Sequence, residues 1–418
     1  MKKFIVFTLI IAMALSFAFA NGTSEQKQEE VTVRMWTFID PEGTGGRNVA
    51  LKQMINEFEA DNPGVHIVVE PKNWQTMTAE FLAAAATGTA PDIMWCSTGL
   101  LYGCIEGGLL TPYEDLFMKD WTAEQIEDVN DAFFKFGEKD GKHYTLGLSK
   151  NAVVLYYRSD ILEKAGCTVP TTFEELYEVA KACTDPANGI YGLGQEFVDG
   201  DYPLFSNYIL SKQGSLFNPD GTANFATEAG VEALNYMKRF VDEGIIPYEC
   251  ISKIGEDITL EFQAGKYAMM VRGFVRVGQV KANASYDPKT VKVAPIPTGS
   301  WIDGWHVGVW SGSKVKDWAG KFVEKMYTTE SDLLWVNLGA QAPVRKSTKD
   351  MVTITEDNDY IAVAGEIFET GYNIPNDKPY EGLKPCLLTA LQKVVVDNVD
   401  PMTALQAAEK EFNTKNGR

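Results

Sequence analysis

The chain of 418 residues carries a formal net charge of −19 at pH 7, from 57 acidic and 38 basic side chains. Binding to nucleic acid through counterion release requires a basic surface, so this charge disfavours a nucleic-acid partner and favours a soluble monomer. The length exceeds the size at which a single hydrophobic core usually stops growing, and we therefore expect two domains.

The first twenty residues predict a secretory signal. They combine the basic start Met1-Lys2-Lys3, an apolar run from Phe4 to Ala14 and the small-residue ending Ala18-Phe19-Ala20. An uncleaved membrane anchor is the alternative, but the apolar run falls short of the roughly 20 residues that a span needs. We expect a periplasmic protein whose signal is cleaved near Ala20. A lipid anchor is not expected, because the first cysteine is Cys96.

A polar tether is expected at residues 21–30. Its segment TSEQKQEE has no apolar side chain and cannot bury enough surface to offset its ordering entropy. No later stretch is long and apolar enough to enter a bilayer, which favours a soluble mature chain.

Strands and helices are predicted to alternate after the tether. Val31 to Phe38 is β-branched and aromatic-rich, the apolar spacing from Leu51 to Phe58 is helical, and VHIVVE at 65–70 is a second strand. An amphipathic helix over 74–85 and a buried strand over 92–96 complete a βαβαβ order. This order predicts a parallel sheet, and ligands bind at the carboxyl ends of such strands.

The alternation continues along the rest of the chain. Thr122 with Gln125, and Thr172 with Glu175, have the spacing of capping boxes at helix starts. The first of these helices is expected to bury Ile126, Val129 and Phe133. The other elements predicted here are a near-continuous apolar strand at 151–158, a helix over 231–241, a strand at 292–296, a helix around Trp318, and C-terminal helices between 384 and 413.

The sequence lacks the common motifs of enzymes and metal sites. It has no GxSxG, HExxH or GxxxxGK[ST] pattern, and His66, His143 and His306 form no ligand-like pair. The six cysteines include no CxxC, so we expect no zinc site, no other metal and no cofactor. We expect a protein that is not an enzyme, with a secreted glycosidase as the alternative, since sequence alone does not exclude a carboxylate pair.

The redox state of the cysteines is left open by the sequence. In an exported protein, Cys96 could pair with Cys104 and Cys167 with Cys183, and buried free thiols are the alternative.

Four segments, in this order, resemble the family 1 extracellular solute-binding proteins of ABC transporters, which include the maltose-binding protein. The segments are ATGTAPDIMW at 86–95, LYYRSDILEKAGCTVPTTFEEL at 155–176, FQAGKYAMM at 262–270 and APVRKS at 342–347. The resemblance implies an α/β fold of the two-lobed, type II periplasmic-binding-protein class. It also implies two partners, a small-molecule ligand held in an inter-lobe cleft and the membrane permease of an ABC importer.

The resemblance further implies where the lobes begin and end. Each lobe would combine two stretches of chain, 31–149 with 310–343 for the N-terminal lobe and 154–305 with 346–418 for the C-terminal lobe. Three crossings would act as hinges, near 150–153, 306–309 and 344–345.

A carbohydrate is the expected ligand, because aromatic residues are frequent at the predicted strand ends. Sugars present apolar C–H faces and polar hydroxyl edges, so their sites need aromatic rings and hydrogen-bonding side chains. A polyamine, a peptide or another polar solute is the alternative ligand. The glycine-rich segment EGTGGRN could hold a phosphate on helix N–H groups, but we interpret it as a turn bordering the cleft.

Candidate contacts of the N-terminal lobe follow its strands, and the resemblance supports them. They are Trp36, Phe38 and Asp40 after the first strand, Trp95, Ser97 and Thr98 at the third, and Asn151 near the first hinge. Core packing is the alternative for both tryptophans, turn formation for Asp40 and hinge capping for Asn151.

Candidate contacts of the C-terminal lobe rest on the same resemblance. They are Glu196 and Asp199 after YGLGQ, Arg272 and Phe274 after GKYAMM, Trp301 and Trp305 before the second crossing, and Tyr380 and Glu381 ahead of the last helices. Relatives often carry a tryptophan close to the position of Phe274, and Trp301 or Trp305 could supply that ring here.

Overall fold

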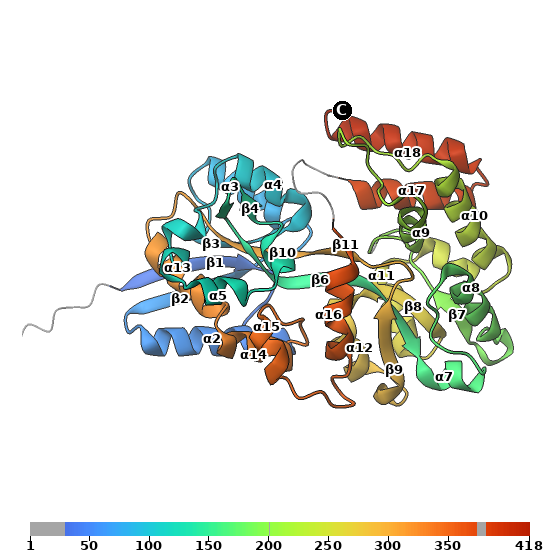
Figure 1. The fold of residues 1–418 in the computed structure, drawn as a ribbon, viewed down its shortest axis with the longest axis horizontal. Coiled ribbons are helices and arrows are strands. Elements are labelled where there is room, and N and C mark those ends of the chain that lie inside the picture. The colour runs from blue at the N-terminus through green and yellow to red at the C-terminus, as the bar shows by residue number, and fades with distance from the viewer. Residues whose placement is uncertain (1–29, 200, 374–381) are drawn as a thin grey trace, which may run out of the picture.

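Two α/β lobes lie side by side, and two long strands, β6 and β10, run from one to the other (Figure 1). The computed structural model describes residues 30–199, 201–373 and 382–418. The expected signal at 1–20, most of the tether at 21–30, and Tyr380 and Glu381 lie outside the described residues. The two-lobed α/β fold predicted from the sequence is confirmed.

The N-terminal lobe is built on a parallel sheet, as the βαβαβ order predicts. Strand β1 (Val31–Thr37) lies between β2 (Val65–Pro71) and β3 (Ile93–Ser97) and is parallel to both. Helix α2 (Gly46–Asp61) connects β1 to β2 and buries Leu51, Met54, Ile55 and Phe58, the residues that its apolar spacing singled out. Helix α3 (Met77–Ala86) begins three residues later than expected.

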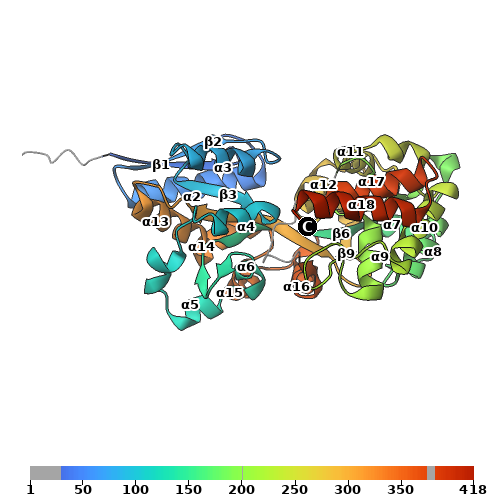
Figure 2. The same ribbon diagram turned by 90° about the horizontal axis from the view of Figure 1, so that it is seen from above.

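Other helices of this lobe cover the sheet and its edges (Figure 2). They are α4 (Thr98–Glu106), α5 (Ala123–Glu127), α6 (Asp131–Phe134), α13 (Lys316–Met326), α14 (Thr329–Asn337) and α15 (Lys346–Met351). Strands β4 (Glu138–Lys139) and β5 (Lys142–His143) pair antiparallel and form a short hairpin.

The capping boxes are present, but one helix is shorter than predicted. Thr122 and Gln125 exchange hydrogen bonds of 2.9 and 3.2 Å, and Thr172 and Glu175 form the same motif. Helix α5 ends at Glu127, so the expected helix does not reach Val129 or Phe133. It stops there because Asp128 accepts hydrogen bonds from Ser347, and the Asn130 N–H donates to Val344 at 2.9 Å.

The C-terminal lobe is centred on the second half of β6 (Leu146–Arg158). That half pairs antiparallel with β8 (Tyr267–Gly273) and β9 (Val291–Pro295), and β7 (Tyr191–Gly194) lies parallel to β8. The strand order across both lobes is β2-β1-β3-β10-β6-β8-β7. Strand β11 (Tyr372–Asn373) pairs with the start of β10 (Trp301–Val309).

The helices of this lobe surround its strands and form the outer layer of the molecule (Figure 1). They are α7 (Ser159–Lys164), α8 (Phe173–Ala182), α9 (Leu204–Gln213), α10 (Glu228–Asp242), α11 (Gly255–Gln263), α12 (Val277–Asn283), α16 (Tyr360–Thr370), α17 (Leu383–Val395) and α18 (Pro401–Lys415). None of the helices within 30–199, 201–373 and 382–418 combines the length and apolar character that a membrane crossing requires.

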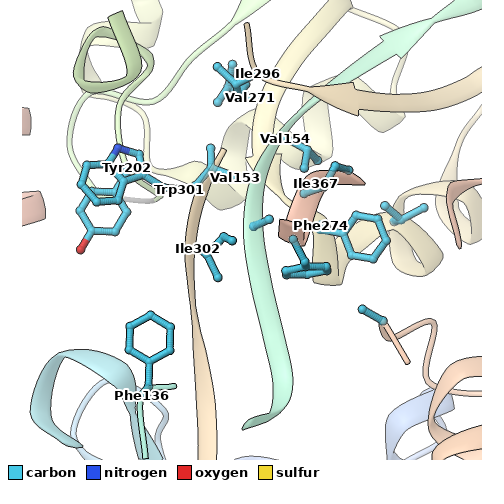
Figure 3. Close-up of a cluster of buried hydrophobic side chains, with 14 of the residues drawn as sticks. Phe136, Val153, Val154, Tyr202, Val271, Phe274, Ile296, Trp301, Ile302 and Ile367 are labelled. Atoms are coloured by element: carbon cyan, nitrogen blue, oxygen red, sulfur yellow. The ribbon is translucent and has the colours of Figure 1, made fainter. Parts of the chain in front are cut away.

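The hydrophobic core continues through the region where the strands cross. Figure 3 shows Val153 and Val154 of β6 beside Trp301 and Ile302 of β10, all of them buried. The lobes therefore share a packed connection instead of a loose linker.

Backbone pairing locates the first two crossings. Residues 153–157 of β6 pair with β8, so this crossing lies close to the expected 150–153. Trp305 already pairs with Ser97 of β3, which places 305–309 in the N-terminal sheet. We therefore propose that β10 crosses at 302–304, upstream of the expected 306–309.

The third crossing follows α15. The Lys346 N–H donates to the Asp128 carbonyl at 2.7 Å, which holds the start of α15 on the N-terminal lobe. Asp359 forms ion pairs with Lys281 and Lys292 of the C-terminal lobe. We therefore propose a crossing between Met351 and Asp359, downstream of the expected 344–345.

All six cysteines are free thiols, and both pairs considered from the sequence are neighbours. The Cys96 and Cys104 sulfurs lie 3.7 Å apart in the core. Burial, together with the neighbouring Cys167, raises the pKa of Cys183 to about 12.

Candidate functional site: a cleft between the lobes

A cleft of about 700 Å³ lies between the lobes and is lined by residues of both. Seven of the residues predicted from the sequence line it, namely Phe38, Ser97, Thr98, Asn151, Asp199, Arg272 and Trp305. They come from the end of β1, the β3–α4 junction, the middle of β6, the loop after β7, β8 and β10. Strand ends from the two sheets therefore converge on one cavity, as expected for an α/β fold.

Two aromatic rings form a platform on one wall of the cleft. The Phe38 and Trp305 rings lie 4.8 Å apart at an interplanar angle of 55°, and both are half-buried. Trp95 stands edge-on behind Phe38 at 5.6 Å and is fully buried. Both rings of the platform line the cavity and Trp95 packs behind Phe38, so the platform offers an aromatic surface that the C–H face of a sugar could contact.

Polar side chains lie beside this platform where the strands cross. Asn151 of β6 is directly opposite Asp303 of β10 in the sheet. The Asn151 Oδ1 accepts a hydrogen bond from the Val275 N–H at 3.4 Å. Burial raises the pKa of the Asp303 carboxyl, and the charge of Lys384 opposes that shift. These amide and carboxyl groups can exchange hydrogen bonds with ligand hydroxyls.

The β3–α4 junction contributes the hydroxyl groups of Ser97 and Thr98. The Thr98 Oγ1 donates to the Gly304 carbonyl at 3.1 Å and is hydrogen-bonded to His306 at 3.3 Å. The junction is therefore tied to the crossing segment of β10.

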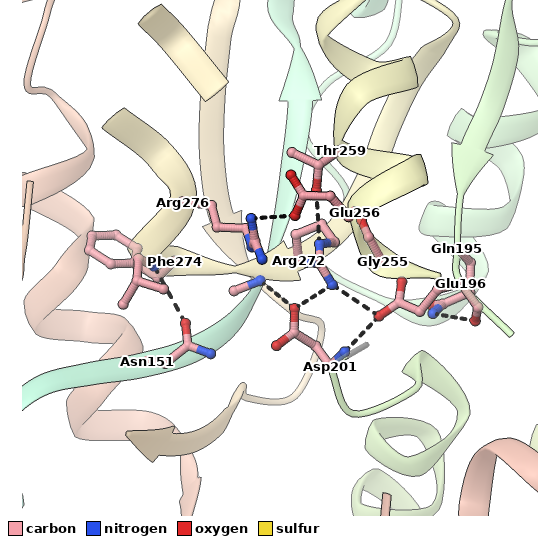
Figure 4. A network of polar contacts seen from close by, with 12 residues as sticks. Asn151, Gln195, Glu196, Asp201, Gly255, Glu256, Thr259, Arg272, Phe274 and Arg276 are labelled. Carbon is pink, nitrogen blue, oxygen red and sulfur yellow. Dashed lines mark hydrogen bonds and ion pairs between the residues drawn. The ribbon is translucent and has the colours of Figure 1, made fainter. Parts of the chain in front are cut away.

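A buried ionic network around Arg272 supports the opposite wall (Figure 4). The Arg272 Nη1 lies 2.8 Å from the Asp201 carboxylate and 3.4 Å from the Glu196 carboxylate. The Arg272 Nε donates to the Thr259 hydroxyl at 3.1 Å. Gly255 leaves room for this guanidinium, because a Cβ there would lie 2.0 Å from Nη1. The network fixes the loop between β7 and α9 against β8.

The pKa values of the two carboxyls of this network shift in opposite directions. Burial raises the pKa of Glu196 to about 7, although Arg272 is near. Burial acts in the same direction on Asp201, but the charges of Arg272, Lys384 and Arg276 together with a hydrogen bond from the Gly273 N–H outweigh it, and the pKa of Asp201 is lowered. Asp201 is therefore the main counter-ion of Arg272.

Several predicted contacts lie in the core and do not line the cleft. Trp36 is buried and donates from Nε1 to Glu70 at 2.9 Å, and Trp95 packs between Phe38 and Trp335. Phe274 is buried against Tyr360 and Phe368. For both tryptophans the structure matches the core-packing alternative.

Three further predicted contacts are also held elsewhere. Trp301 is buried, stacks on Tyr202 at 4.6 Å and donates to the Ser206 hydroxyl at 2.7 Å. Glu196 is fully buried beside Arg272. Asp40 is exposed and accepts from the Glu42 N–H at 2.9 Å, which matches the turn-forming alternative.

Other residues of the cleft were missed by sequence reasoning. They are Arg47, Trp74, Gln75, Ser149, Asp201, Tyr202, Glu256, Arg276, Asp303 and Lys384, among others. Asp303 could have been predicted from the sequence, because strand alternation places it on the same face as Trp305. Gln75 and Asp199 approach from opposite lobes, with a hydrogen bond of 3.4 Å from Nε2 to Oδ2 that no local pattern could reveal.

Metal binding has no support in the part of the chain that the structure describes. No group of three or more His, Cys, Asp or Glu side chains there is arranged to hold an ion.

Comparison with known proteins agrees with this geometry. The sequence profile of a family described as bacterial extracellular solute-binding protein matches residues 53–362. YcjN of Escherichia coli (strain K12), which has the provisional name of an ABC transporter periplasmic-binding protein, is 24% identical over 438 residues, covering 97% of each chain.

Solved structures share the fold at low sequence identity. The GacH receptor of Streptomyces glaucescens GLA.O superimposes with a TM-score of 0.79 and 23% identity, over 93% of this chain and 99% of that one. MalE3 of T. maritima gives a TM-score of 0.79 and 20% identity, over 92% and 100%. With a profile match over more than half of its length, the chain belongs to the bacterial extracellular solute-binding protein family.

Proposed function

We propose that this protein is the substrate-binding component of an ABC importer, and that it captures a carbohydrate between its lobes and delivers it to the permease. The observation that carries the proposal is the Phe38–Trp305 platform, which is open to the cleft and has Asn151 and Asp303 nearby. Rings for the C–H faces and carboxyl or amide groups for the hydroxyls are the two elements that a sugar site combines.

Lobe closure is the step by which capture would be signalled. The ligand would contact side chains of both lobes, and only a differential affinity for the closed form can shift the equilibrium toward it. Gln75 and Asp199 already meet across the cleft, and the β6 and β10 crossings are the segments that would absorb the rotation. The permease would then recognise the rims of both lobes in their closed arrangement.

The structural neighbours supply a second line of support for a carbohydrate. GacH has been crystallised in complex with acarbose, and MalE3 with maltose. These ligands were bound to GacH and MalE3. At 20–23% identity the two structures share their fold with this chain, and a carbohydrate ligand for this chain is part of the proposal.

A thermal-shift screen of the mature protein tests the proposal. A ligand that binds only the folded form adds about 2.7 kcal/mol to the free energy of unfolding at a hundred times its Kd. We expect at least one mono- or oligosaccharide to raise the midpoint, and the same sugar to raise the midpoint of the Trp305→Ala variant by a smaller amount. A shift with spermidine, a peptide or an amino acid and none with any sugar would reject the carbohydrate assignment.

We further propose that the protein does not hydrolyse its ligand. Glycosidases need a pair of carboxyl groups that can act as acid and as base or nucleophile. In this cleft Asp201 and Glu256 are each paired with an arginine at 2.8 Å, Asp199 accepts a hydrogen bond from Gln75, and Asp303 lies opposite Asn151, so each carboxyl has a neighbour on the protein that suits a binding role. Incubation with the sugar that gives the largest thermal shift should release no product, and any turnover seen by chromatography would overturn this part.

Export and a monomeric state complete the proposal. Protein recovered from the periplasm should begin near Asn21 on N-terminal sequencing, because the small residues at Ala18 and Ala20 fit a signal peptidase site. Light scattering should give the mass of one chain. A retained N-terminus would contradict cleavage of the signal, and a stable dimer would contradict the monomeric state.

A further inference from the structure

The charges lining the cleft are balanced, in contrast with the acidic chain as a whole. Four acidic side chains, Asp199, Asp201, Glu256 and Asp303, face four basic ones, Arg47, Arg272, Arg276 and Lys384, while the full sequence has 57 acidic and 38 basic residues. Cations therefore form a larger share of the charged side chains in the cleft than in the whole chain, and a cation there without a carboxylate partner can attract an anionic ligand.

Most of these cations are used by the protein itself. Arg272 is held by Asp201 and Glu196, and Arg276 lies 2.8 Å from Glu256. Lys384 lies near Asp201 and Asp303, and its charge contributes to the lowered pKa of Asp201 and opposes the rise that burial causes in the pKa of Asp303. Within the described residues, no carboxylate lies at ion-pair distance from Arg47 or Lys384, but Lys384 has the charges of Asp201 and Asp303 near it, whereas the charge that acts on Arg47 is that of Arg276.

The charged neighbour of Arg47 is another cation, on the other lobe. Arg47 lies in the first turn of α2 and Arg276 at the start of α12, and both line the cleft. Burial, and then the charge of Arg276, lowers the pKa of Arg47 to about 10. Closing the cleft around a neutral ligand would leave these two guanidinium groups repelling each other.

We infer that the carbohydrate carries an anionic group, a carboxylate or a sulfate, and that Arg47 and Arg276 bind it from the two lobes. This inference rests on the proposed function and assigns the class of sugar. An anion placed between the two arginines replaces a repulsion by two charge-assisted hydrogen bonds, and it does so only when the lobes are closed. The guanidinium fork matches the planar carboxylate and can equally bind sulfate oxygens.

The position of Arg47 relative to the aromatic platform fits an acidic sugar. Its guanidinium carbon lies 5.6 Å from the centroid of the Phe38 ring, and Phe38 forms the platform with Trp305. A pyranose ring stacked on the platform would therefore place an acidic substituent at its edge within reach of Arg47. The same ring would leave its hydroxyl groups to Asn151 and Asp303.

Calorimetric titration with matched ligands tests the inference. The panel contains neutral oligosaccharides of glucose, galactose and mannose, the corresponding uronic-acid oligomers, and sulfated galacto-oligosaccharides. We expect the tightest ligand to be anionic and to bind about tenfold or more tightly than its neutral counterpart, with an affinity that falls as salt is raised. The uronate and sulfate arms identify which anion is bound.

Variants of Arg47 separate this inference from the proposed function. Arg47→Gln should remove most of the preference for the anionic ligand, because it weakens binding of that ligand far more than binding of the neutral counterpart, while Arg47→Lys should retain part of the preference. Lys52→Gln is the matched control, because Lys52 lies on the same helix outside the cleft and pairs with Glu42. An unchanged preference in Arg47→Gln, or a neutral tightest ligand, would overturn the anionic class and leave the carbohydrate proposal standing. A panel in which no sugar binds would overturn both.

Discussion

The rings of Phe38 and Trp305 lie against each other, 4.8 Å between centroids, although one follows β1 and the other lies on β10. They meet because β10 returns antiparallel beside β3, so that Trp305 is level with Ser97 at the end of that strand. Strands far apart in the sequence thereby build one surface, and the function proposed above depends on it.

Removing the larger ring of this platform should weaken ligand binding more than it weakens the fold. Trp305→Ala is expected to lower the affinity for the best sugar about tenfold or more, because a stacked aromatic ring contributes roughly 0.5–1.5 kcal/mol beyond the area it buries. Calorimetry gives the affinity, and thermal unfolding without ligand gives the stability. Trp318→Ala is the control, since Trp318 is half-buried on α13 away from the cleft. Equal losses of affinity in both variants would contradict the assignment.

Breaking the ionic network behind the cleft should destabilise the C-terminal lobe. Arg272→Met leaves the buried Asp201 and Glu196 carboxyls without their cation, and we expect a loss of about 3–5 kcal/mol in urea unfolding. Lys52→Met, which breaks an exposed pair with Glu42, should cost less than about 1 kcal/mol. Adding Asp201→Asn and Glu196→Gln to Arg272→Met should recover part of the loss. A triple variant no more stable than the single one would show that packing, and not the unpaired charge, is responsible.

Stability should fall in mild acid because of His306. This histidine is 1% exposed, and burial, together with the charge of Lys150, lowers its pKa from 6.5 to about 3. Below pH 6.5 the unfolded chain binds a proton at this position and the folded chain does not, so stability decreases as the pH falls through the window from 6.5 to 3. Each pH unit within that window costs roughly 1 kcal/mol.

His306→Phe tests this statement, because it keeps a ring in the core and removes the titration. Its stability relative to the wild type should improve progressively as the pH is lowered from 6.5 to 5, measured by urea unfolding. Val309→Ala, a buried change on the same strand without a titrating group, should show a difference that is independent of pH. The same slope for both variants would exclude His306 as the cause.

Gly304 is expected to be essential for the β10 crossing. Its φ is +150°, and a Cβ there would lie 2.7 Å from the Ser149 carbonyl oxygen of β6. Gly304→Ala should therefore cost roughly 1–3 kcal/mol and separate the strands that place Asp303 and Trp305. Thermal unfolding checks the cost. Gly103→Ala, in helix α4 with open space around its Cβ, should be neutral or slightly stabilising, and a comparable loss there would refute the steric argument.

The local elements followed directly from the sequence, because each depends on residues close together in the chain. The apolar spacing of α2, the β-branched run of β1 and the two capping boxes required no knowledge of the rest of the fold. The parallel order of the first three strands also followed from their alternation with helices. The end of α5 did not, because it depends on contacts with Ser347 and Val344, far along the chain.

The sequence by itself determined the two-lobed α/β class, the strand ends that converge on the cleft and the resemblance to solute-binding proteins. Only the tertiary structure decided which side chains face the cavity. Trp301, Asp303 and Trp305 share one face of β10 by alternation, yet Tyr202 covers Trp301, while Asp303 and Trp305 line the cleft. The placement of Arg47 and Arg276 on the same cleft could not be predicted either, because they come from different lobes. A local pattern defines the face on which a side chain lies, but what covers that face is set by segments from distant parts of the chain.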